Sequence, residues 1–580
     1  MLQTADLIKT HCISFLKTNT ISEEDIEKIK FVVDINKDID RGDLYTNFAL
    51  VTSKLFNQNP IVIAINLAEY LHQQLDKSIF KKVEAADAYV NFYLVDTFEM
   101  PKDNTISHPD FTGKKIAYEY TDPNPMKEFH IGHLMSNTIG EAISRLGELA
   151  GADVKRYSYQ GDTGRHLAVT MWGLRFMENP WPDAEGITIT EKVRFLGQAY
   201  VIGNKKMTEA KEEGGEKCSR VMTEIETMNQ KIYDRSDEEV NILYDQGKEW
   251  SLEKFEELYA ILGTKFDHYF FESQTAPIGK KIVEENLHAT SSIFVKGEND
   301  ATIFEGEAYG LHTRVFINSK GLPTYEAKEI GLAKVKYDVW QYDKSIVLTA
   351  NEQNEVFKVT NKAITLLMPE IGSKMEHLGH GMMQFVGAKM SSRTGKILAG
   401  DELVEDMMES SYEKMAERDM SEQEKRSVAK DVAVAAIKFS ILKQNFRKNI
   451  IFDKEKALSL EGDSGPYIQY AIVRINSIEK KTVGLDFSET KQEMTPEAQN
   501  LNRTLWRYNH MCYKAIDEFA PQYIAQYLID LASKFNGFYS KNKIIEDEKV
   551  HKELLELCVK TREVLTQGLT TLGIRVVERM

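Results

Sequence analysis

The sequence has little cysteine, with only Cys12, Cys218, Cys512 and Cys558 among 580 residues. These residues lie far apart and form no C-x-x-C pair, so we expect buried thiols rather than a disulfide framework or a structural zinc site. Long hydrophobic runs are also missing, since no uncharged apolar stretch reaches the length of a membrane span and the N-terminus lacks the pattern of a signal peptide. The sequence therefore predicts a cytosolic protein that does not associate with membranes.

The sequence has fewer basic than acidic residues, 73 Lys and Arg against 89 Asp and Glu, so the formal net charge is −16 at pH 7. Such a chain repels a polyanion at long range, so any nucleic-acid partner must meet local basic patches. One candidate is the stretch 421–450, with seven basic and three acidic residues. By itself that stretch is more typical of a solvated helix face.

The pattern divides the chain into three parts, as its length suggests. Residues 1–108 mix helical periodicity with a β-rich end and predict a small α+β domain. Residues 109–401 contain strand–helix–strand patterns, and they predict an α/β catalytic domain with a Rossmann-like, doubly wound parallel sheet and a ligand at the carboxyl ends of its strands. Residues 402–580 show amphipathic helical segments and predict an all-α bundle. We find no repeats and no low-complexity tract.

The segment "KEFHIGHLMSN", residues 127–137, places His130 and His133 around Gly132 just after a predicted strand and at the start of a predicted helix. Free N–H groups and the helix dipole favour a phosphate at such a position. Gly132 would let a nucleotide approach the backbone, and the imidazoles could donate hydrogen bonds to phosphate oxygens. The alternative is a pair of histidines that only caps a loop.

A second candidate is the segment "GAKMSSRTGK", residues 387–396, a basic and hydroxyl-rich stretch flanked by glycines. Such a loop suits a departing pyrophosphate, although lysine and serine are also common on surface loops.

Together the two segments resemble the "HIGH" and "KMSKS" signatures of class I aminoacyl-tRNA synthetases. Further segments resemble the arginyl-tRNA synthetase family: "EYTDPNPMKEFHIGHL", "YSYQGDTG", "KGLPTYEAKEIGLAK", "GDSGPYIQYAIVRI" and the final "LGIRVVERM". The N-terminal "RGDLYTNFAL" and "YVNFYL" resemble that family's small first domain, and the part from residue 402 its anticodon-binding domain. The resemblance implies an arginine–tRNA ligase that activates L-arginine with magnesium-bound ATP, transfers it to tRNA(Arg), acts as a monomer and needs no tightly bound metal.

The resemblance also assigns residues to ATP and its phosphates: Lys127, His130, Gly132, His133, Lys389, Ser391 and Ser392. Of these, Lys127, His130, His133 and Lys389 are the predicted catalytic residues. Ser392 stands where the family's second motif usually has a lysine. We expect Lys127, just before the first motif, to replace the missing charge.

Arginine has a planar guanidinium that never deprotonates, so its pocket needs a carboxylate and further acceptors. By resemblance, Glu119 and Asn124 would hold the ammonium and carboxylate of the substrate. Tyr325, Glu329 and Gln353 would shape the pocket for its side chain. Here Lys328 and Glu329 replace the family's Arg-Asp pair, which places the carboxylate one methylene further out. Asp122 likewise replaces a usual serine. Singly, each of these residues is as typical of a strand end or a protein surface, and Tyr325 is as typical of a core aromatic residue. Their joint spacing favours the site.

The resemblance assigns tRNA contacts to six residues: Asn91, Tyr93, Tyr467, Gln469, Tyr470 and Arg474. Exposed aromatic rings beside cations are suited to unstacked bases. Ordinary strand packing is an alternative for the first two, and Ile472 replaces a familiar histidine near the last four.

Two other classes of protein remain possible from the residues alone. A small-molecule nucleotidyltransferase also uses H-x-G-H at a helix start, but it has no need of a long helical domain. A non-catalytic tRNA-binding relative would be expected to lose His130, His133 or Lys389, which this chain keeps. The insertion at about 165–300 shows no editing motif. The sequence does not give the tRNA identity elements or whether tRNA must bind before arginine is activated.

Overall fold

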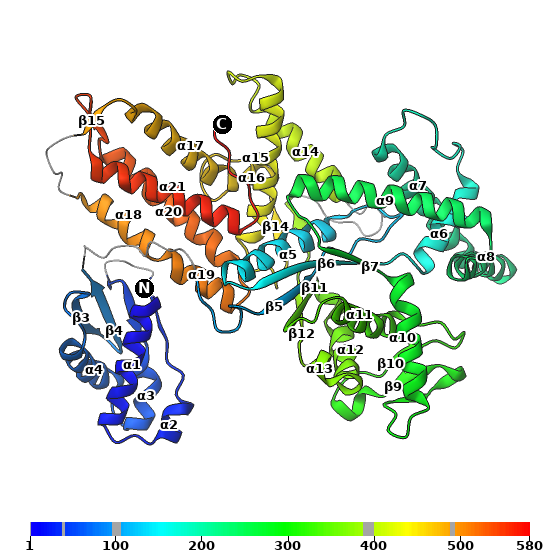
Figure 1. Ribbon diagram of the computed structural model, residues 1–580, viewed down its shortest axis with the longest axis horizontal. Helices are drawn as coiled ribbons and strands as arrows, with labels where there is room; N and C mark the ends of the chain where they lie inside the picture. Colours follow the sequence, from blue (N-terminus) through cyan, green and yellow to red (C-terminus); the bar gives the residue numbers. More distant parts are fainter. Residues whose placement is uncertain (1, 37–40, 96–105, 387–398, 488–493) are drawn as a thin grey trace. The chain divides into compact units, whose positions relative to one another are not determined.

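The computed structural model describes residues 2–36, 41–95, 106–386, 399–487 and 494–580 (Figure 1). The chain forms two compact units. Unit 1 comprises residues 1–106, 470–518 and 523–568, and unit 2 comprises 107–469, 519–522 and 569–580. The domain boundaries expected after residues 108 and 401 stay predictions.

Unit 2 is built on a five-stranded parallel sheet in the order β12-β11-β5-β6-β7. Its strands are β5 (Lys115–Glu119), β6 (Asp153–Gln160), β7 (His268–Phe271), β11 (Lys344–Ala350) and β12 (Met375–His380). From β5 the chain moves to β6 and β7 on one side and later to β11 and β12 on the other. The strand order therefore reverses between β5 and β11, and the predicted doubly wound sheet is confirmed.

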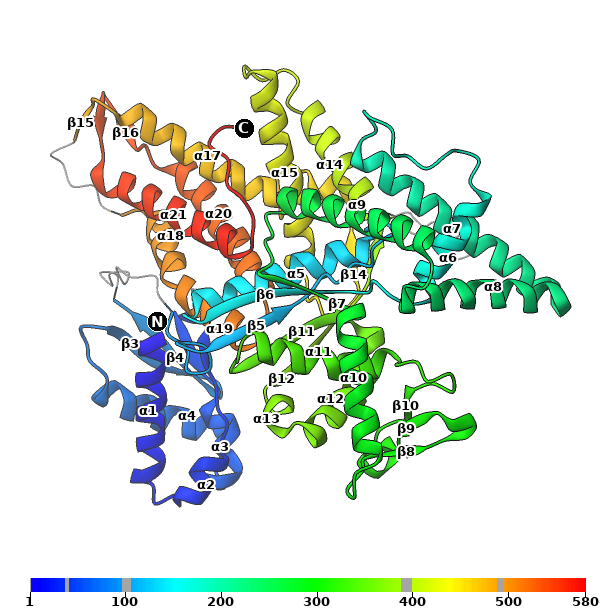
Figure 2. The same cartoon turned by 45° about the vertical axis from the view of Figure 1, so that its right-hand side comes forward.

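Helices cover both faces of this sheet, as Figures 1 and 2 show. Because side chains alternate along a strand, Ala117 faces α11 (Tyr325–Val339) and packs near its Leu332. Tyr118 and the following Tyr120 face α5 (Ile131–Leu149), where they fill the space beside two glycines of that helix. The sheet is thus buried on both faces.

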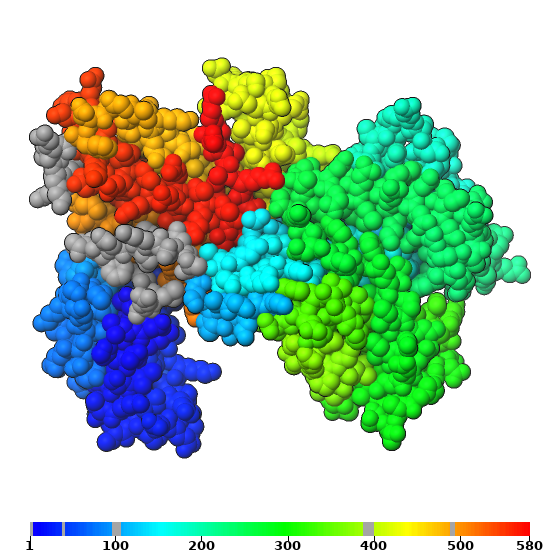
Figure 3. Space-filling view, in the orientation of Figure 1, coloured from blue at the N-terminus to red at the C-terminus, as the bar shows by residue number. Residues whose placement is uncertain are grey.

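The insertion between β6 and β7 is helical and stands out at the right of unit 2, coloured cyan to green (Figure 3). It contains α6 (Arg165–Gly173), η2 (Leu174–Phe176), α7 (Ile189–Glu213), α8 (Gly215–Asp234) and α9 (Glu238–Leu262). These helices bury their own apolar cluster around Trp172, Leu196 and Trp250.

The second half of unit 2 begins with α10 (Glu272–Leu287) and a small antiparallel sheet. That region includes β8 (Phe294–Lys296), η3 (Glu298–Asp300), β9 (Thr302–Phe304), η4 (Gly306–Tyr309) and β10 (Arg314–Ile317). After β11 follow η5 (Asn351–Gln353), α12 (Asn354–Leu367), α13 (Pro369–Gly372), β13 (Met383–Phe385), α14 (Gly400–Glu413), α15 (Glu422–Leu442), β14 (Ile450–Phe452) and α16 (Lys454–Ala457).

Unit 1 contains the expected small α+β domain, which is confirmed. Its antiparallel sheet has the order β1-β2-β4-β3. The elements are α1 (Leu2–Thr18), α2 (Glu23–Lys28), β1 (Val33–Ile35), β2 (Leu44–Thr46), α3 (Phe48–Phe56), α4 (Pro60–Gln74), β3 (Phe80–Ala86) and β4 (Tyr89–Leu94). Trp506, the last residue of α18 (Pro496–Trp506) and far away in the sequence, joins this core.

The C-terminal part of the chain, from Gly465 onward, is helical, as predicted, with only short strands among its described residues. Its elements are α17 (Gly465–Thr482), β15 (Asp486–Phe487), α18 (Pro496–Trp506), α19 (Tyr508–Asp517), α20 (Gln522–Lys541), β16 (Ile545–Glu546), β17 (Lys549–Val550) and α21 (Lys552–Thr571). Cys12, Cys512 and Cys558 are buried as expected, while Cys218 is partly exposed. Among the described residues, no helix combines the length and the apolarity needed to cross a membrane.

Candidate active site

The two histidines of the "HIGH" segment form a stacked pair at the first turn of α5. Their ring centroids lie 3.6 Å apart at an interplanar angle of 18°. His130 Nδ1 accepts a hydrogen bond from the Gly132 amide at 3.1 Å, and His133 Nδ1 accepts one from the His130 amide at 3.3 Å. The imidazoles therefore cap the helix, as the loop-capping alternative supposed, and each keeps its Nε2 free of these backbone bonds.

Both imidazoles are neutral at physiological pH. Burial and the nearby charge of Lys127 lower the pKa of His130 to about 4. Burial, followed by the effects of His130 and Lys127, lowers the pKa of His133 well below its usual range. Since each Nδ1 accepts a hydrogen bond, the single proton of each neutral ring is on Nε2. The pair thus offers two N–H donors, without positive charge, beside the N-terminus of a long helix.

Gly132 is required by the histidine pair itself. A Cβ at this position would come within 2.9 Å of Cε1 and Nδ1 of His130, so a side chain here would displace the ring. Lys127 lies nearby, with its Nζ 5.7 Å from the ring centre of Tyr200 on α7. After the gap at 387–398, Ala399 forms a β-bridge with His130, and the Gly400 amide donates to the Phe129 carbonyl at 2.6 Å.

The end of β5 holds a buried ion pair. Glu119 Oε2 accepts a hydrogen bond at 2.6 Å from Nζ of Lys336, on α11, and these residues are 3% and 1% exposed. Lys336 also donates to Ser345 Oγ at 3.3 Å. Burial alone would lower the pKa of Lys336, but the charge of Glu119 raises it. The positive charge of Lys336 therefore balances the charge of the Glu119 carboxylate in an ion pair. The sequence did not single out Lys336.

Glu329 lies on α11, as Lys336 does, but unlike Glu119 it has a carboxylate oxygen without a partner among the described residues. It is 2% exposed, and its Oε1 has no hydrogen-bond partner in the described part of the chain. Burial and the charge of Glu119 raise the pKa of Glu329 to about 8. Tyr325, one helical turn earlier, acts on the same carboxyl group, and burial together with the charge of Glu329 raises the pKa of its hydroxyl well above the usual range. A buried carboxylate oxygen without a partner lowers the stability of the folded protein unless a cation binds to it.

A second lysine, Lys328, holds another carboxylate near Glu329. Its Nζ donates to Glu272 Oε2 at 2.7 Å and lies 3.4 Å from Thr163 Oγ1. Glu272 is the first residue of α10, directly after β7, and its charge contributes to the raised pKa of Glu329. In the described part of the chain, this group therefore combines the carboxyl groups of Glu119, Glu272 and Glu329 with the amines of Lys328 and Lys336.

The segment between β5 and α5 has an unusual backbone. Thr121, Asp122 and Met126 have φ values of 80°, 46° and 59°, and such left-handed residues other than glycine are uncommon. Asp122 Oδ1 accepts a hydrogen bond from the Tyr159 amide at 2.7 Å, which links this segment to β6. Burial and the charge of Glu119 raise the pKa of Asp122 well above its usual range.

The other residues expected in the arginine pocket lie at the same edge of the sheet. Asn124 follows β5, and its Oδ1 lies so close to Gly161, after β6, that a Cβ there would be 2.3 Å away. Gln353 ends η5, directly after β11. The structure thus gathers Glu119, Asn124, Tyr325, Glu329 and Gln353 around the carboxyl ends of β5, β6 and β11, where the strand order reverses.

Models of known protein families match most of the chain. The family model for the class I (R) tRNA synthetase catalytic domain matches residues 101–454. The chain belongs to the arginyl-tRNA synthetase family. The family's N-terminal domain model matches residues 5–94, and the DALR anticodon-binding domain model matches residues 468–580.

Relatives of similar length extend this assignment over the whole chain. A Clostridium botulinum arginine–tRNA ligase is 28% identical and is matched over 99% of each chain. A Porphyromonas gingivalis arginine–tRNA ligase is 27% identical over 91% of this chain and 92% of its own. In fold, the Thermus thermophilus arginyl-tRNA synthetase is similar with a TM-score of 0.79 at 23% identity, covering 99% of this chain and all of its own. The Plasmodium falciparum arginyl-tRNA synthetase gives a TM-score of 0.76 at 19% identity, with 100% and 99% coverage.

The residues expected to contact tRNA differ in exposure. Asn91 is buried, and its Oδ1 accepts from Asn36 at 3.4 Å, which is the strand packing noted as the alternative. Tyr93 donates from its hydroxyl to Glu84 at 2.6 Å. Gln469 is buried and donates at 2.7 Å to the carbonyl of Arg575 in the C-terminal segment. These contacts are structural, and the tRNA roles of the three residues stay predictions.

Tyr470 and Arg474 form a partly exposed group within unit 1. The Arg474 guanidinium lies 4.9 Å from the ring centre of Tyr470 and 5.6 Å from that of the exposed Tyr539 on α20. Tyr467 is partly buried at the start of α17. Base stacking on such an array remains a prediction that the structure permits.

Three predicted residues, Lys389, Ser391 and Ser392, lie outside the described residues. Sequence reasoning missed Glu272 and Lys336 and gave Lys328 no role. Lys336 lies on the helix face of Tyr325 and Glu329, at helical spacings, so the 3.6-residue period could have pointed to it. Glu272 follows a parallel strand, where polar residues gather at a ligand site.

Proposed function

We propose that this chain performs the reaction of its family, in which arginine is activated by ATP as arginyl-adenylate and then transferred to tRNA(Arg). The observation that carries the proposal is the unpartnered Oε1 of Glu329, buried at the carboxyl edge of the sheet. An arginine guanidinium supplies the cation and planar donors that this oxygen lacks.

The pocket's lysines direct the substrate to Glu329. Lys336 already occupies one oxygen of Glu119, and Lys328 occupies one oxygen of Glu272. Glu329 is therefore the carboxyl group left to bind the guanidinium, with Tyr325 beside it. The remaining oxygen of Glu119, at the end of β5, and the side chain of Asn124, in the segment after β5, are then left for the ammonium and carboxylate of the substrate.

In this proposal the phosphates of ATP bind at the start of α5. The Nε2–H groups of His130 and His133 and the helix N-terminus would donate to the α-phosphate as charge builds on its oxygens. The arginine carboxylate oxygen attacks the α-phosphorus, the bond to the β-phosphate oxygen breaks, and pyrophosphate leaves. A ribose hydroxyl of tRNA then attacks the activated carbonyl carbon and releases AMP. No covalent link to the protein forms in either step.

The proposal includes magnesium with the ATP, a monomer, and action in the cytoplasm. Magnesium is supported by the charge that must be neutralised on the triphosphate, since the two histidines are neutral. The monomer is supported by the family resemblance, and the compartment by the composition of the chain.

The test is attachment of each of the twenty amino acids to total tRNA in the presence of ATP and magnesium. We expect charging with arginine alone. Charging with another amino acid would contradict the assigned pocket, and tRNA binding without any charging would indicate a non-catalytic relative.

Lys127 has a specific predicted role in the first step. Its charge reaches both histidines, so it lies where it can offset the lysine missing from the second motif. We expect Lys127→Ala to slow arginyl-adenylate formation about 100-fold, comparable to loss of one group that stabilises the transition state. The affinity for arginine should stay within about twofold. Pre-steady-state measurement with tRNA present separates the two quantities.

Lys206→Ala is the matched control, because Lys206 also lies on an aromatic ring, 4.6 Å from that of Phe176, but has no effect on the histidines. An unchanged rate of adenylate formation in Lys127→Ala would refute the compensating role.

A further inference from the structure

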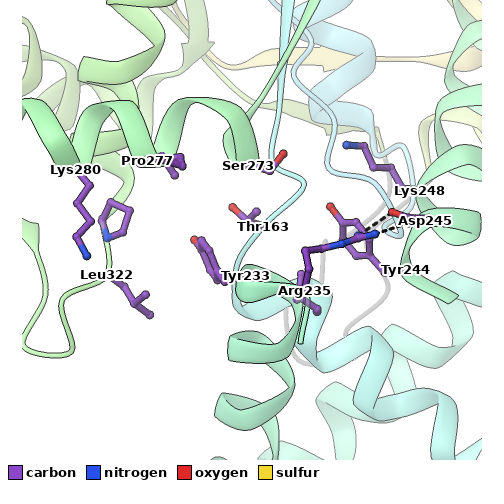
Figure 4. A pocket seen from close by; sticks show the side chains of 13 residues that line it. Thr163, Tyr233, Arg235, Tyr244, Asp245, Lys248, Ser273, Pro277, Lys280 and Leu322 are labelled. Carbon is purple, nitrogen blue, oxygen red and sulfur yellow. Dashed lines mark hydrogen bonds and ion pairs between the residues drawn. The ribbon is translucent and has the colours of Figure 1, made fainter. Parts of the chain in front are cut away.

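The segment between β5 and α5 carries Asn124 and leads to the histidine pair. It is tied to β6, where the Tyr159 amide donates to Asp122 Oδ1 at 2.7 Å. Thr163, in the loop that follows β6, lines a cavity of about 460 Å³ (Figure 4). The Oγ1 of Thr163 donates to Glu272 Oε2 at 3.1 Å, so these contacts belong to the substrate site already described.

The same segment is also tied to α5 by hydrogen bonds between buried residues. The hydroxyl of Tyr120 donates to Glu141 Oε2 at 2.7 Å. The Thr121 amide donates to Ser136 Oγ at 3.0 Å, and Asn137 Nδ2 donates to Thr121 Oγ1 at 3.1 Å. Because Thr121 has a φ of 80°, these contacts stabilise a backbone conformation that residues other than glycine rarely adopt. The start of the segment is therefore fixed by the middle of α5.

Glu141 is the acidic member of this group of residues. It is 1% exposed, its Oε1 accepts from Arg145 Nε at 2.7 Å, and its Oε2 lies 3.4 Å from Arg156 Nε. Although burial raises the pKa of this carboxyl group, the charges of Arg156, Arg145 and Lys438 hold it below its usual range. Glu141 is therefore ionised at neutral pH and is a strong acceptor for the hydroxyl of Tyr120.

The C-terminal segment, residues 569–580, belongs to unit 2 and packs against Glu141. The buried Lys438 donates from Nζ to the Gly573 carbonyl at 2.9 Å. Gly573 has a φ of 69°, and a Cβ there would lie 3.2 Å from Cγ of Glu141 and 3.4 Å from Nε of Arg145. A side chain at this position would press on Glu141 and strain the backbone, so the close approach depends on glycine.

We propose that Glu141 is a positioning residue for arginine. Covered by the C-terminal segment, it holds Tyr120 and thereby the turn between Glu119 and Asn124. The inference rests on the proposed function, in which Glu119 and Asn124 hold the ammonium and the carboxylate of arginine. Because Tyr120 directly follows Glu119, a shift of its ring displaces the partners of the substrate. The phosphates of ATP are assigned to the start of α5, so loss of the Tyr120 hydroxyl should affect arginine and not ATP.

The test is Tyr120→Phe in the full-length protein, which removes the hydroxyl and keeps the ring. Loss of this hydrogen bond to a charged group should raise KM for arginine about tenfold, with kcat within about threefold and KM for ATP within about twofold. Steady-state aminoacylation at saturating tRNA gives all three values. The split separates positioning from a general loosening of the fold, which would change both KM values and kcat together.

Tyr118→Phe is the matched control. Tyr118 lies on β5, is buried and faces the same helix, but its hydroxyl has no hydrogen-bond partner in the described part of the chain. This variant should behave as the wild type does. Equal effects of the two substitutions, or an equal rise of both KM values in Tyr120→Phe, would overturn the inference.

A second variant, Gly573→Ala, perturbs Glu141 from the C-terminal segment. Its added Cβ should raise KM for arginine about threefold and add little to Tyr120→Phe, because both changes act through one carboxylate. Gly310→Ala is its control, since Gly310 also has a φ of 69° but no atom of the described residues lies within 4 Å of an added Cβ. Full additivity with Tyr120→Phe, or the same effect in Gly310→Ala, would contradict the role of Glu141.

Failure of this inference is distinct from failure of the proposed function. If the wild type charges tRNA with arginine and Tyr120→Phe matches Tyr118→Phe, only the role of Glu141 is wrong. If the wild type charges nothing, the proposed function is wrong and the role of Glu141 falls with it.

Discussion

Glu329 in unit 2 is a buried carboxyl group and Asp34 in unit 1 a partly buried one, and their hydrogen-bond partners differ. Asp34 accepts from His510 Nε2 at 2.9 Å and from Lys514 Nζ at 3.0 Å, so each oxygen has its own donor. Although burial raises it, the hydrogen bonds from His510 and Lys514 hold the pKa of Asp34 below its usual range. Glu329 has an oxygen without a donor, and burial raises its pKa to about 8.

Asp34 joins structural elements, whereas Glu329 is the carboxylate that we propose binds the guanidinium of the substrate. Asp34 connects β1 with α19, two elements far apart in the chain but within one unit. Its charge is satisfied inside the protein and contributes to stability. Glu329 costs stability in its charged form, and a bound cation would recover that cost. Changes that exchange these roles test the comparison.

The largest effect is expected from Glu329→Gln, which removes the charge that arginine would meet. Loss of a buried charge partner costs about 2–5 kcal/mol, so kcat/KM for arginine should fall roughly 1,000-fold. Glu329→Asp keeps the charge and should retain measurable charging. Aminoacylation kinetics with tRNA present give both values.

Thermal melting adds a check on the same variant. The pKa of Glu329 is raised in the folded state, so the unfolded chain loses its proton first and stability declines as pH rises from about 4.5 to about 8. Glu329→Gln should therefore melt higher than the wild type at pH 8 and equally at pH 4. A lower melting temperature at pH 8 would show that the carboxylate is a structural partner like Asp34.

The next effect is expected at Lys336, which makes Glu119 resemble Asp34. Lys336→Met leaves Glu119 buried without its cation and should lower the free energy of unfolding by about 3–5 kcal/mol. Adding Glu119→Gln should restore most of that stability but not arginine binding, since a carboxylate is still missing. Chemical denaturation and arginine titration of the single and double variants measure both outcomes. Full recovery of arginine binding in the double variant would remove Glu119 from the site.

Much of this comparison could be predicted from sequence, but only where the pattern is local. The strand before residue 120 and the helix that starts after His130 follow from short motifs. A short motif also carries the pocket role of Glu329, which stays a prediction. The partner of Glu119 does not, because Lys336 is 217 residues away and is chosen by the packing of α11 on the sheet. Glu272 was missed for the same reason, because it starts α10 and accepts a hydrogen bond from Lys328 on another helix, α11.

Burial also decides what charge patterns mean. Lys438 belongs to the basic stretch 421–450 expected on a helix face, yet it is buried and donates at 2.9 Å to the Gly573 carbonyl. Asn91 likewise looked available for tRNA but lies inside its sheet. The sequence gives the charge and polarity of such residues. Only the packed structure shows whether a partner molecule can reach them.

A smaller effect is expected from Asp34→Asn. The variant loses two charge-assisted hydrogen bonds in a partly buried position and should be less stable by about 1–3 kcal/mol near pH 7. Since the pKa of Asp34 is lowered in the folded state, its contribution is present above the unfolded pKa of about 4 and disappears as pH falls below it. The melting temperatures of variant and wild type should therefore converge in acid, while charging at 25 °C stays unchanged. A loss of charging at full stability would mean that Asp34 is not only structural.

The smallest effect is a proton exchanged on arginine binding. With a pKa of about 8, Glu329 is mostly protonated at pH 7, and an arginine guanidinium beside it would lower that pKa. Binding should therefore release close to one proton at pH 7 and almost none at pH 9.5, where the carboxyl is already ionised. Calorimetric titration in buffers of different ionisation enthalpy measures this number, and Glu329→Gln should abolish it while Asp34→Asn leaves it intact. If no proton is released at pH 7, Glu329 is already charged before the ligand arrives, and the contrast with Asp34 would then lie in hydrogen bonding alone.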